Sequence, residues 1–270
     1  MALASGCAGR PEAPILQRFL GSEAAQTKAR LDALLPADVL LIGEQHDARA
    51  HHQIEQELIS ILAGRGLLGA IALEMADAGT STARLKPSAT EEQARQALQW
   101  DNKSWPWAHY EPAVMTAVRA GVPVLGANLP RSQMPGSMAD RTLDTRLPEP
   151  ALQMQQQAIR SGHCGLLPES QVSPMTRLQI AKDITMAETI RQVALPGKVV
   201  VLLAGSGHVN RTLGVPQHLQ GDLKFKAVGL QAGQGSAELA PAFDSVWITP
   251  ALPDKDHCAR LQEQLSRRGS

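Results

Sequence analysis

The sequence predicts an α/β protein with a mostly parallel central sheet flanked by helices and a helical insertion between the second and third strands. Two observations lead to this class: short continuous apolar runs recur along the chain, and segments with helical spacing of apolar residues separate them. Such runs are typical of strands buried on both faces, which occur in parallel sheets covered by helices. The 270 residues, 43% of them hydrophobic, suffice for one large domain with its own core.

The expected elements follow one another in a regular order along the chain. The first apolar run, ADVLLIG, lies between Pro36 and Gly43, and the last two runs are less apolar than the others. Strands are expected at 37–43, 69–75, 122–130, 198–208, 223–231 and 244–250. Helices are expected at 49–63, 90–100, 149–163 and 174–194. In the first of these helices, Asp47 is a candidate N-cap, and we expect His51 and His52 to face solvent.

One domain is expected over residues 21–250, with a long polar insertion at 77–111. Residues 1–20 are interpreted as an N-terminal tether and residues 251–270 as a C-terminal tail. Basic and acidic residues balance at 26 each, so bulk charge gives no indication of a nucleic-acid partner. No stretch is apolar for long enough to cross a bilayer.

Cysteine usage gives a further indication about the compartment. No C-x-x-C pair occurs, which excludes a zinc ribbon or a thioredoxin-type motif. Cys7 lies in LASGCAG, which resembles a bacterial lipobox, but no apolar signal segment precedes it. The true start would then lie upstream with a signal peptide; the alternative is an accidental small-residue terminus. Whether Cys164 and Cys258 pair stays open, because their separation in space is unknown from sequence.

Polar side chains follow four of the expected strands. Because the carboxyl ends of parallel strands converge at one edge of a sheet, we expect these side chains to lie close together. Glu74 interrupts an apolar run, where an unpaired carboxylate would be costly. Helix caps and tight turns explain each residue singly, whereas the set favours a site. The set comprises Glu44, His46, Asp47, Glu74, Asn128, Arg131, Ser206 and His208.

The segment WDNKSWPWAHYEP, residues 100–112, holds three of the four tryptophans and the only tyrosine, Tyr110. Its polar spacing fits neither a strand nor a long helix, so a loop is expected. One interpretation is an aromatic loop packed on the sheet edge. The other is a flat apolar ligand gripped by apolar walls that include Trp107, with His109 and Tyr110 as polar contacts. Tyrosinate is a known axial ligand of ferric haem, and iron lets a phenol release its proton.

Seven segments between about residues 36 and 220 together resemble one known family. The segments are LLIGEQHDARAHHQ, ALEM, WPWAHYEPAV, VPVLGANLPR, GHCGLLP, KDITMAETI and VLLAGSGHVNRTLGVPQHL. In this order they resemble the ChaN family of iron-regulated haem-binding lipoproteins. The family lies in a wider superfamily with Tiki and TraB proteins and erythromycin esterases, whose members share two Gly-x-x-His motifs and a strand-end glutamate. The residues of this chain that match that polar cleft are Glu44, His46, Glu74 and His208.

The resemblance implies a haem-binding lipoprotein in iron or haem acquisition. It implies that haem binds across a homodimer, with Tyr110 on the iron and basic side chains at the propionates. No motif decides which basic residues serve; the candidates are His109, Arg131, His163 and Lys182. It also implies a lipid anchor on Cys7 in the bacterial cell envelope, at the outer membrane or periplasmic face. An outer-membrane haem receptor would then be a partner.

An enzymatic function remains open beside haem binding. In a metal-dependent hydrolase, a peptidase or esterase, His46 and His208 would hold a divalent metal ion together with Glu74. Glu44 would then act as general base on a bound water molecule. Two histidines and two glutamates suit a catalytic metal site. A G-x-S-x-G elbow and a helical H-E-x-x-H are both absent, which argues against a serine hydrolase and an ordinary zincin.

Overall fold

Strands and helices alternate along the chain in the computed structural model, which describes residues 15–219, 221, 223–234, 240–253 and 256–268. The strands are β1 Val39–Glu44, β2 Leu68–Asp77, β3 Val124–Asn128, β4 Val199–Gly205, β5 Phe225–Ala232 and β6 Ser245–Thr249. The α-helices are α1 Ile15–Leu34, α2 Arg49–Gly64, α3 Glu91–Ala97, α4 Trp107–Arg119, α5 Met134–Ala139, α6 Glu149–Gly162, α7 Glu169–Val193, α8 Ser206–Val209 and α9 His257–Arg268. Short 3-10 helices are η1 Arg131–Gln133, η2 Arg141–Thr145, η3 Val215–His218 and η4 Ala240–Ala242.

The chain divides into two units, residues 1–35 and residues 36–270. Helix α1 is the described part of the first unit. The predicted tether at 1–20 lies mostly outside the described residues, as does Cys7, and its last residues, from Ile15 on, belong to α1. The predicted domain start at residue 21 falls inside this helix, whereas the second unit begins at Pro36.

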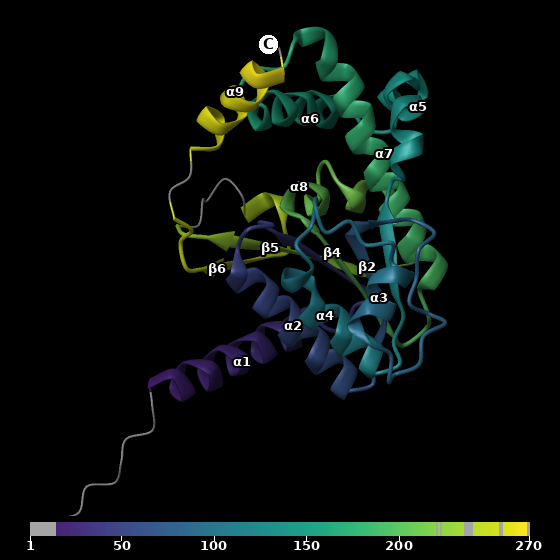
Figure 1. Cartoon of the computed structure of the whole chain (residues 1–270), viewed down its shortest axis with the longest axis vertical. Helices are drawn as coiled ribbons and strands as arrows, with labels where there is room; N and C mark the ends of the chain where they lie inside the picture. Colours follow the sequence, from purple (N-terminus) through teal and green to yellow (C-terminus); the bar gives the residue numbers. More distant parts are fainter. Residues whose placement is uncertain (1–14, 220, 222, 235–239, 254–255, 269–270) are drawn as a thin grey trace, which may run out of the picture. The chain divides into compact units, whose positions relative to one another are not determined.

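A six-stranded sheet forms the centre of the second unit (Figure 1), and its strand order is β3-β2-β4-β1-β5-β6. Every pair of neighbouring strands is parallel. Strands β1 and β4 lie in the middle, and their register pairs Glu44 with Gly205 at the carboxyl ends. Ligands of open parallel sheets bind beyond this edge, so the fold places the predicted polar residues where a site is expected.

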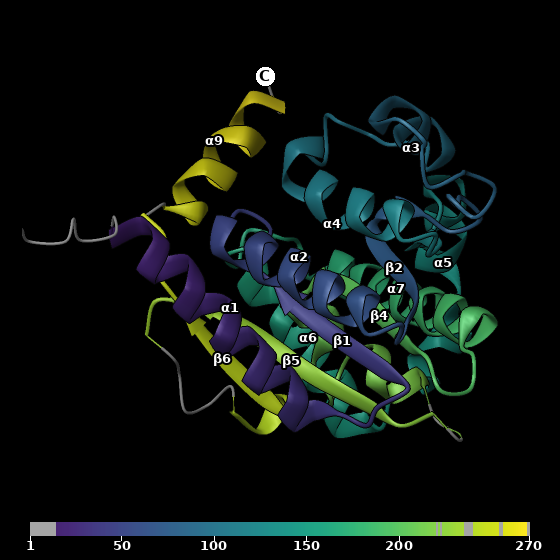
Figure 2. The same ribbon diagram turned by 90° about the horizontal axis from the view of Figure 1, so that it is seen from below.

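Helices cover both faces of the sheet (Figures 1 and 2). Helices α2 and α4 pack on one face, whereas α7 and α8 contact the other face. All six residues of β1 are buried, as the continuous apolar run predicts. A core cluster joins the central strands to the inward face of α7 through Met186, Ala187 and Ile190.

The predicted order of strands and helices and the helical insertion between β2 and β3 are confirmed, with ends shifted by a few residues. The loop predicted for 100–112 is wrong in its last part, because Trp107 begins α4. The buried residues of this helix recur at helical spacing, as Tyr110, Ala113, Val114, Ala117 and Val118. Most of this apolar stripe lies beyond residue 112, so the polar segment alone does not reveal it.

Residues 251–270 are predicted to form a C-terminal tail. Their described part contains the loop that follows β6 and then helix α9. Cys258 of α9 forms a disulfide with Cys164, which follows α6. The two half-cystines are 94 residues apart in sequence. This bond answers the question that the sequence leaves open about their pairing. Among the described residues, no helix combines the length and apolarity that a membrane crossing requires.

Candidate functional site

Glu44 is the centre of a polar cluster at the carboxyl end of β1. Its Oε1 accepts a hydrogen bond from the Tyr110 hydroxyl at 2.7 Å and another from His46 Nδ1 at 2.7 Å. Its Oε2 lies 3.1 Å from His52 Nε2. Burial alone would raise the pKa of Glu44, but the contacts with His46 and His52 outweigh burial and lower it to about 2. Glu44 is therefore ionised at neutral pH.

A second group joins the ends of β2 and β4. Glu74 is buried, accepts the Gly205 N–H at 2.7 Å and lies 3.3 Å from His208 Nε2. The other ring nitrogen of His208 contacts Asp183 of α7 at 2.5 Å. Burial opposes the charge on His208, yet Glu74 and Asp183 raise its pKa to about 10. Because burial is outweighed by His208 and His46, the pKa of Glu74 lies well below its usual range.

His46 connects the two groups and is the most exposed of these side chains, with 37% of its side chain accessible. Its Nε2 lies 3.8 Å from Glu74 Oε2, and its ring meets Trp105 edge-on with centroids 4.8 Å apart. A Cβ atom at Gly205 would stand 2.9 Å from His46 Nε2. A larger residue at this strand end would press on the His46 ring where it approaches Glu74.

The strand-end prediction thus holds for the positions of Glu44, His46, Glu74 and His208, which the fold brings together. Asn128 ends β3 and Arg131 follows it, and both line a neighbouring cavity. Ser206 donates a hydrogen bond to the Glu44 carbonyl at 2.9 Å and so fixes the end of β1 against α8. Asp47 is not the N-cap of α2, because Ala48 occupies that position without a side-chain cap.

The expectation that His51 and His52 face solvent is wrong, because both are buried. The Gln45 N–H donates to His51 Nδ1 at 2.9 Å, and the other ring nitrogen bonds Thr249 Oγ1. Burial lowers the pKa of His51 to about 4, so it is neutral at pH 7. His52 stacks on the ring of His109 with centroids 4.8 Å apart.

Sequence reasoning missed Glu55. This side chain is 1% exposed, and burial together with the charge on Glu44 raises its pKa well above the usual range. The signal was its place on the buried stripe of α2, where His52, Glu55, Leu58 and Leu62 recur every three or four residues. A glutamate on such a stripe needs a partner in the interior.

Tyr110 does not lie where a flat cofactor could meet it. Its side chain is 1% exposed, and its hydroxyl is committed to Glu44. Burial and the carboxylate of Glu44 raise the pKa of the phenol far above its usual value. Trp107 is buried as well, with its Nε1 3.4 Å from Glu91 of α3. In this arrangement both residues pack in the interior, and their predicted place at a ligand stays a prediction.

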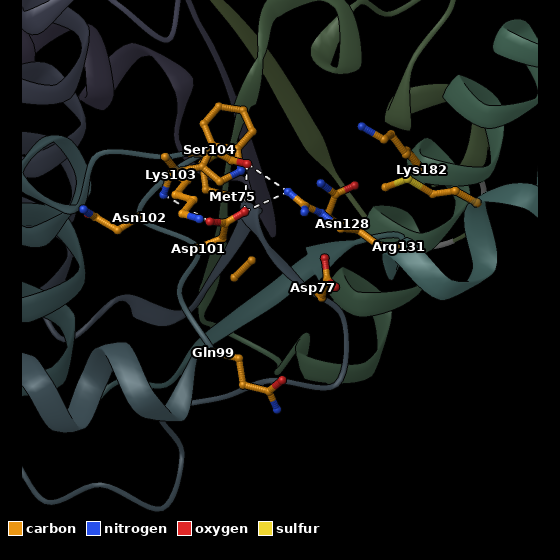
Figure 3. A pocket seen from close by; sticks show the side chains of 13 residues that line it. Met75, Asp77, Gln99, Asp101, Asn102, Lys103, Ser104, Asn128, Arg131 and Lys182 are labelled. Atoms are coloured by element: carbon orange, nitrogen blue, oxygen red, sulfur yellow. Dashed lines mark hydrogen bonds and ion pairs between the residues drawn. The ribbon is translucent and has the colours of Figure 1, made fainter.

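A cavity of about 670 Å³ lies beside the polar cluster (Figure 3). Arg131 and Lys182 both line it, and Trp105 separates it from His46. Figure 3 shows the Arg131 guanidinium pointing toward the insertion, where it bonds Asp101 and Ser104 at 2.8 Å each. His163 is not among the lining residues; its Nδ1 bonds the Ile159 carbonyl at the end of α6.

The structure argues against a metal ion held by His46 and His208. Both ring nitrogens of His208 already face carboxylates, Nε2 facing Glu74 at 3.3 Å and Nδ1 facing Asp183 at 2.5 Å. Within the described part of the chain, three His, Cys, Asp or Glu ligand atoms come within 4.8 Å of one another only in Glu44, His52 and Glu55. His46, Glu74 and His208 do not belong to this group, so the predicted alternative metal site has no support from these distances and stays a prediction.

The fold and cluster define a class: parallel α/β proteins with two Gly-x-x-His strand ends and buried glutamates in one cleft. A sequence model of the family described as haem-binding uptake, Tiki superfamily, ChaN matches residues 30–219. This is more than half of the chain, and the chain therefore belongs to the ChaN family. No curated protein matches the sequence significantly.

A solved structure agrees with this assignment. The fold is similar to that of ChaN from Campylobacter jejuni, described as binding haem cofacially, with a TM-score of 0.66 and 27% identity. The match covers 81% of this chain and 90% of that one. The type III effector HopBA1 matches at 17% identity and TM-score 0.49, covering 80% of this chain and 88% of its own. An erythromycin esterase mutant in its open conformation matches at 16% identity and TM-score 0.49, and the match covers 90% of this chain and 83% of the esterase. These last two carry no functional conclusion.

Proposed function

We propose that this protein binds haem and handles haem or iron in the bacterial cell envelope. Membership of a haem-binding family over residues 30–219 carries the proposal. The similarity to a ChaN that binds haem cofacially, across most of both chains, supports it. The cavity beside Trp105 lies within the 300–1,000 Å³ range that is typical of small-molecule sites.

The residues that line the cavity can bind the propionates and the flat face of a haem, but they include no tyrosine for its iron. Lys182 and Arg131 can bind carboxylates such as propionates, and Trp105 offers a flat aromatic surface. Arg131 would have to exchange Asp101 for a propionate. A bound haem would supply an iron centre, but Tyr110 does not fit as its ligand while its hydroxyl donates to Glu44. Tyrosine ligation remains a prediction of the resemblance and requires this side chain to leave the interior.

A homodimer sharing the haem is the proposed assembly. In cofacial binding the haem planes face each other, and two copies that each bring one haem meet this condition. The mass of the purified protein, measured with and without haem by sedimentation, tests the assembly. We expect the mass to double on saturation with haem. A monomer that stays monomeric at saturation contradicts the dimer without contradicting haem binding.

The disulfide between Cys164 and Cys258 supports an oxidising compartment such as the periplasm. A lipid anchor on Cys7 and an outer-membrane haem receptor as partner complete the proposed setting. Cys7 lies outside the described residues, so only the sequence pattern supports the anchor. Expression with a native upstream segment, followed by mass spectrometry of the membrane fraction, tests it. A protein recovered without lipid from the soluble fraction contradicts the anchor.

A haem titration followed by absorption spectroscopy tests the binding itself. Lys182→Met removes one cavity cation, and Lys86→Met removes an exposed lysine of the insertion as a matched control. A partly exposed ion pair contributes up to about 1 kcal/mol, so we expect affinity to fall up to about fivefold for Lys182→Met alone. Absence of saturable haem binding by the wild type would refute the proposed function. Equal haem affinities of the two variants would show that the propionates do not bind at Lys182 in this cavity.

A hydrolase remains the second candidate, because the strand-end cluster combines strongly perturbed acids with a partly open histidine. His46, held by Glu44, is the residue that could accept a proton from a water or substrate hydroxyl. Turnover of ester and peptide probes by wild type and His46→Ala tests this candidate. Turnover that disappears in the variant supports a peptidase or esterase. No turnover beyond the buffer rate refutes it for those substrate classes.

A further inference from the structure

A buried group of three ionisable side chains lies on the α2 side of Glu44. The ligand atoms of Glu44, His52 and Glu55 all lie within 4.8 Å of one another, and all three residues are buried. The group shares Glu44 and His52 with the polar cluster at the end of β1, and no residue with the second group of Glu74 and His208. The cavity and that second group therefore leave His52 and Glu55 unexplained.

Several polar atoms of this group have no hydrogen-bond partner. They are Glu44 Oε2, His52 Nε2 and both carboxyl oxygens of Glu55. The 3.1 Å contact between His52 and Glu44 lacks hydrogen-bond geometry. Native proteins leave few buried polar atoms unpaired, and a bound ion is one explanation for such a set. We propose that Glu44, His52 and Glu55 bind one divalent transition-metal ion.

The distances are compatible with a shared ion. Nitrogen and oxygen ligands stand about 2.0–2.2 Å from zinc, so two ligands of a tetrahedral site lie roughly 3.4 Å apart. The His52 Nε2 and Glu44 Oε2 atoms are 3.1 Å apart, close to this separation. Glu55 offers a carboxylate oxygen within 4.8 Å of both.

The surroundings hold two of the ligands in place. Glu44 would bind through Oε2 while its Oε1 keeps the hydrogen bonds from Tyr110 and His46. The His52 ring is stacked on His109 and meets Tyr110 edge-on at 5.1 Å between centroids. Ligating carboxylates and imidazoles in metal sites are typically oriented by such outer contacts. This assigns Tyr110 a role in the interior that does not involve haem.

The ligand set selects the class of metal. Two carboxylates and one imidazole combine hard and borderline ligands, which suits Zn²⁺, Fe²⁺ or Mn²⁺. Mg²⁺ and Ca²⁺ prefer sites made of oxygen alone, and soft ions prefer thiolates. His46 and His109, which contact Glu44 and His52, are partly exposed, so the group lies close to solvent.

Zinc titration of the full-length, haem-free protein after chelator treatment tests the proposal by calorimetry. We expect one Zn²⁺ per chain and at least about 100-fold weaker binding of Mg²⁺. Glu55→Gln keeps the shape of the side chain and removes its charge. It should lower Zn²⁺ affinity by more than the roughly 10–100-fold that loss of an outer contact causes. Glu57→Gln, on the same helix but outside the group, is the matched control and should bind as wild type.

A measurement on the wild type protects the test against a variant that fails to fold. Co²⁺ bound to the wild type should give visible ligand-field bands, and saturating Zn²⁺ should quench them one for one. Equal Zn²⁺ affinity in Glu55→Gln and Glu57→Gln would overturn the proposal. Zn²⁺ binding that depends on His208 but not on Glu55 would place the ion in the neighbouring cluster and overturn it as well. If the wild-type protein binds neither Zn²⁺ nor Co²⁺, the proposed metal site is refuted.

Discussion

Replacing Tyr110 by phenylalanine separates a structural role of this side chain from a role on haem iron. The substitution removes one hydroxyl and keeps the ring. In the structure that hydroxyl donates to an ionised carboxylate at 2.7 Å, inside the protein. We therefore expect the variant to lose stability and to keep its haem affinity.

The magnitude follows from the contacts of Glu44. A hydrogen bond to a charged group contributes roughly 1.5–3 kcal/mol to the stability of the fold. Because phenylalanine keeps the aromatic ring, the substitution leaves almost no cavity. In the variant, Glu44 Oε1 still accepts the hydrogen bond from His46, so the buried carboxylate keeps one donor. We expect the free energy of unfolding to fall by about 2 kcal/mol. For a chain of this size the melting temperature should fall by roughly 4–8 °C.

Guanidinium unfolding at neutral pH and a haem titration on the same preparations measure the two effects. A cycle with Glu44→Gln isolates the coupling between the hydroxyl and the carboxylate, which should exceed about 0.5 kcal/mol for residues in contact. The reasoning fails if Tyr110→Phe unfolds like the wild type while its haem spectrum disappears. That result would mean that the phenol resides on the iron and not on Glu44.

Three further perturbations test the same region and its supports. The free energy of unfolding should fall as pH rises from about 6.5 toward about 10, because the folded protein retains the His208 proton that the unfolded chain releases near 6.5. Denaturant titrations across this range should give a steeper slope for wild type than for His208→Gln, and identical slopes contradict the assignment. Gly205→Ala should cost about 1–3 kcal/mol in thermal unfolding, since its Cβ would stand 2.9 Å from a cleft histidine. Gly207→Ala, with no atom within 4 Å of its Cβ, should cost less, and a reversed order refutes the packing. Replacing Cys164 and Cys258 by serine should lower stability by up to about 4–5 kcal/mol, given 94 residues between them, and an unchanged melting point contradicts this.

The strands of this fold could be predicted because their burial leaves a direct trace in the sequence. A strand covered on both faces must be apolar throughout, as in β1, where all six residues are buried. The convergence of Glu44, Glu74 and His208 followed from the parallel arrangement of such strands alone. No contact between these side chains was needed to predict that they meet.

The histidines and the glutamate of α2 were harder to predict. Polar residues near the start of a helix usually face water, and only tertiary packing buries His51, His52 and Glu55. The position of Tyr110 was missed for a related reason. A single tyrosine among tryptophans suggested an accessible ligand, whereas the apolar face of α4 turns it inward against Glu44. Periodicity predicts which residues share a face, but it does not say what that face contacts.

The register of the sheet connects the apolar core to the polar cleft. Pairing of β1 with β4 brings Glu44 opposite Gly205, and the glycine N–H then reaches Glu74 on the far side of β4. A shift by one residue would turn Glu44 to the other face of the sheet and break both contacts. Because buried apolar runs strongly specify their register, the core determines where these charges lie. Substitutions at the carboxyl ends of β1 and β4 should therefore disturb the cleft before they disturb the fold.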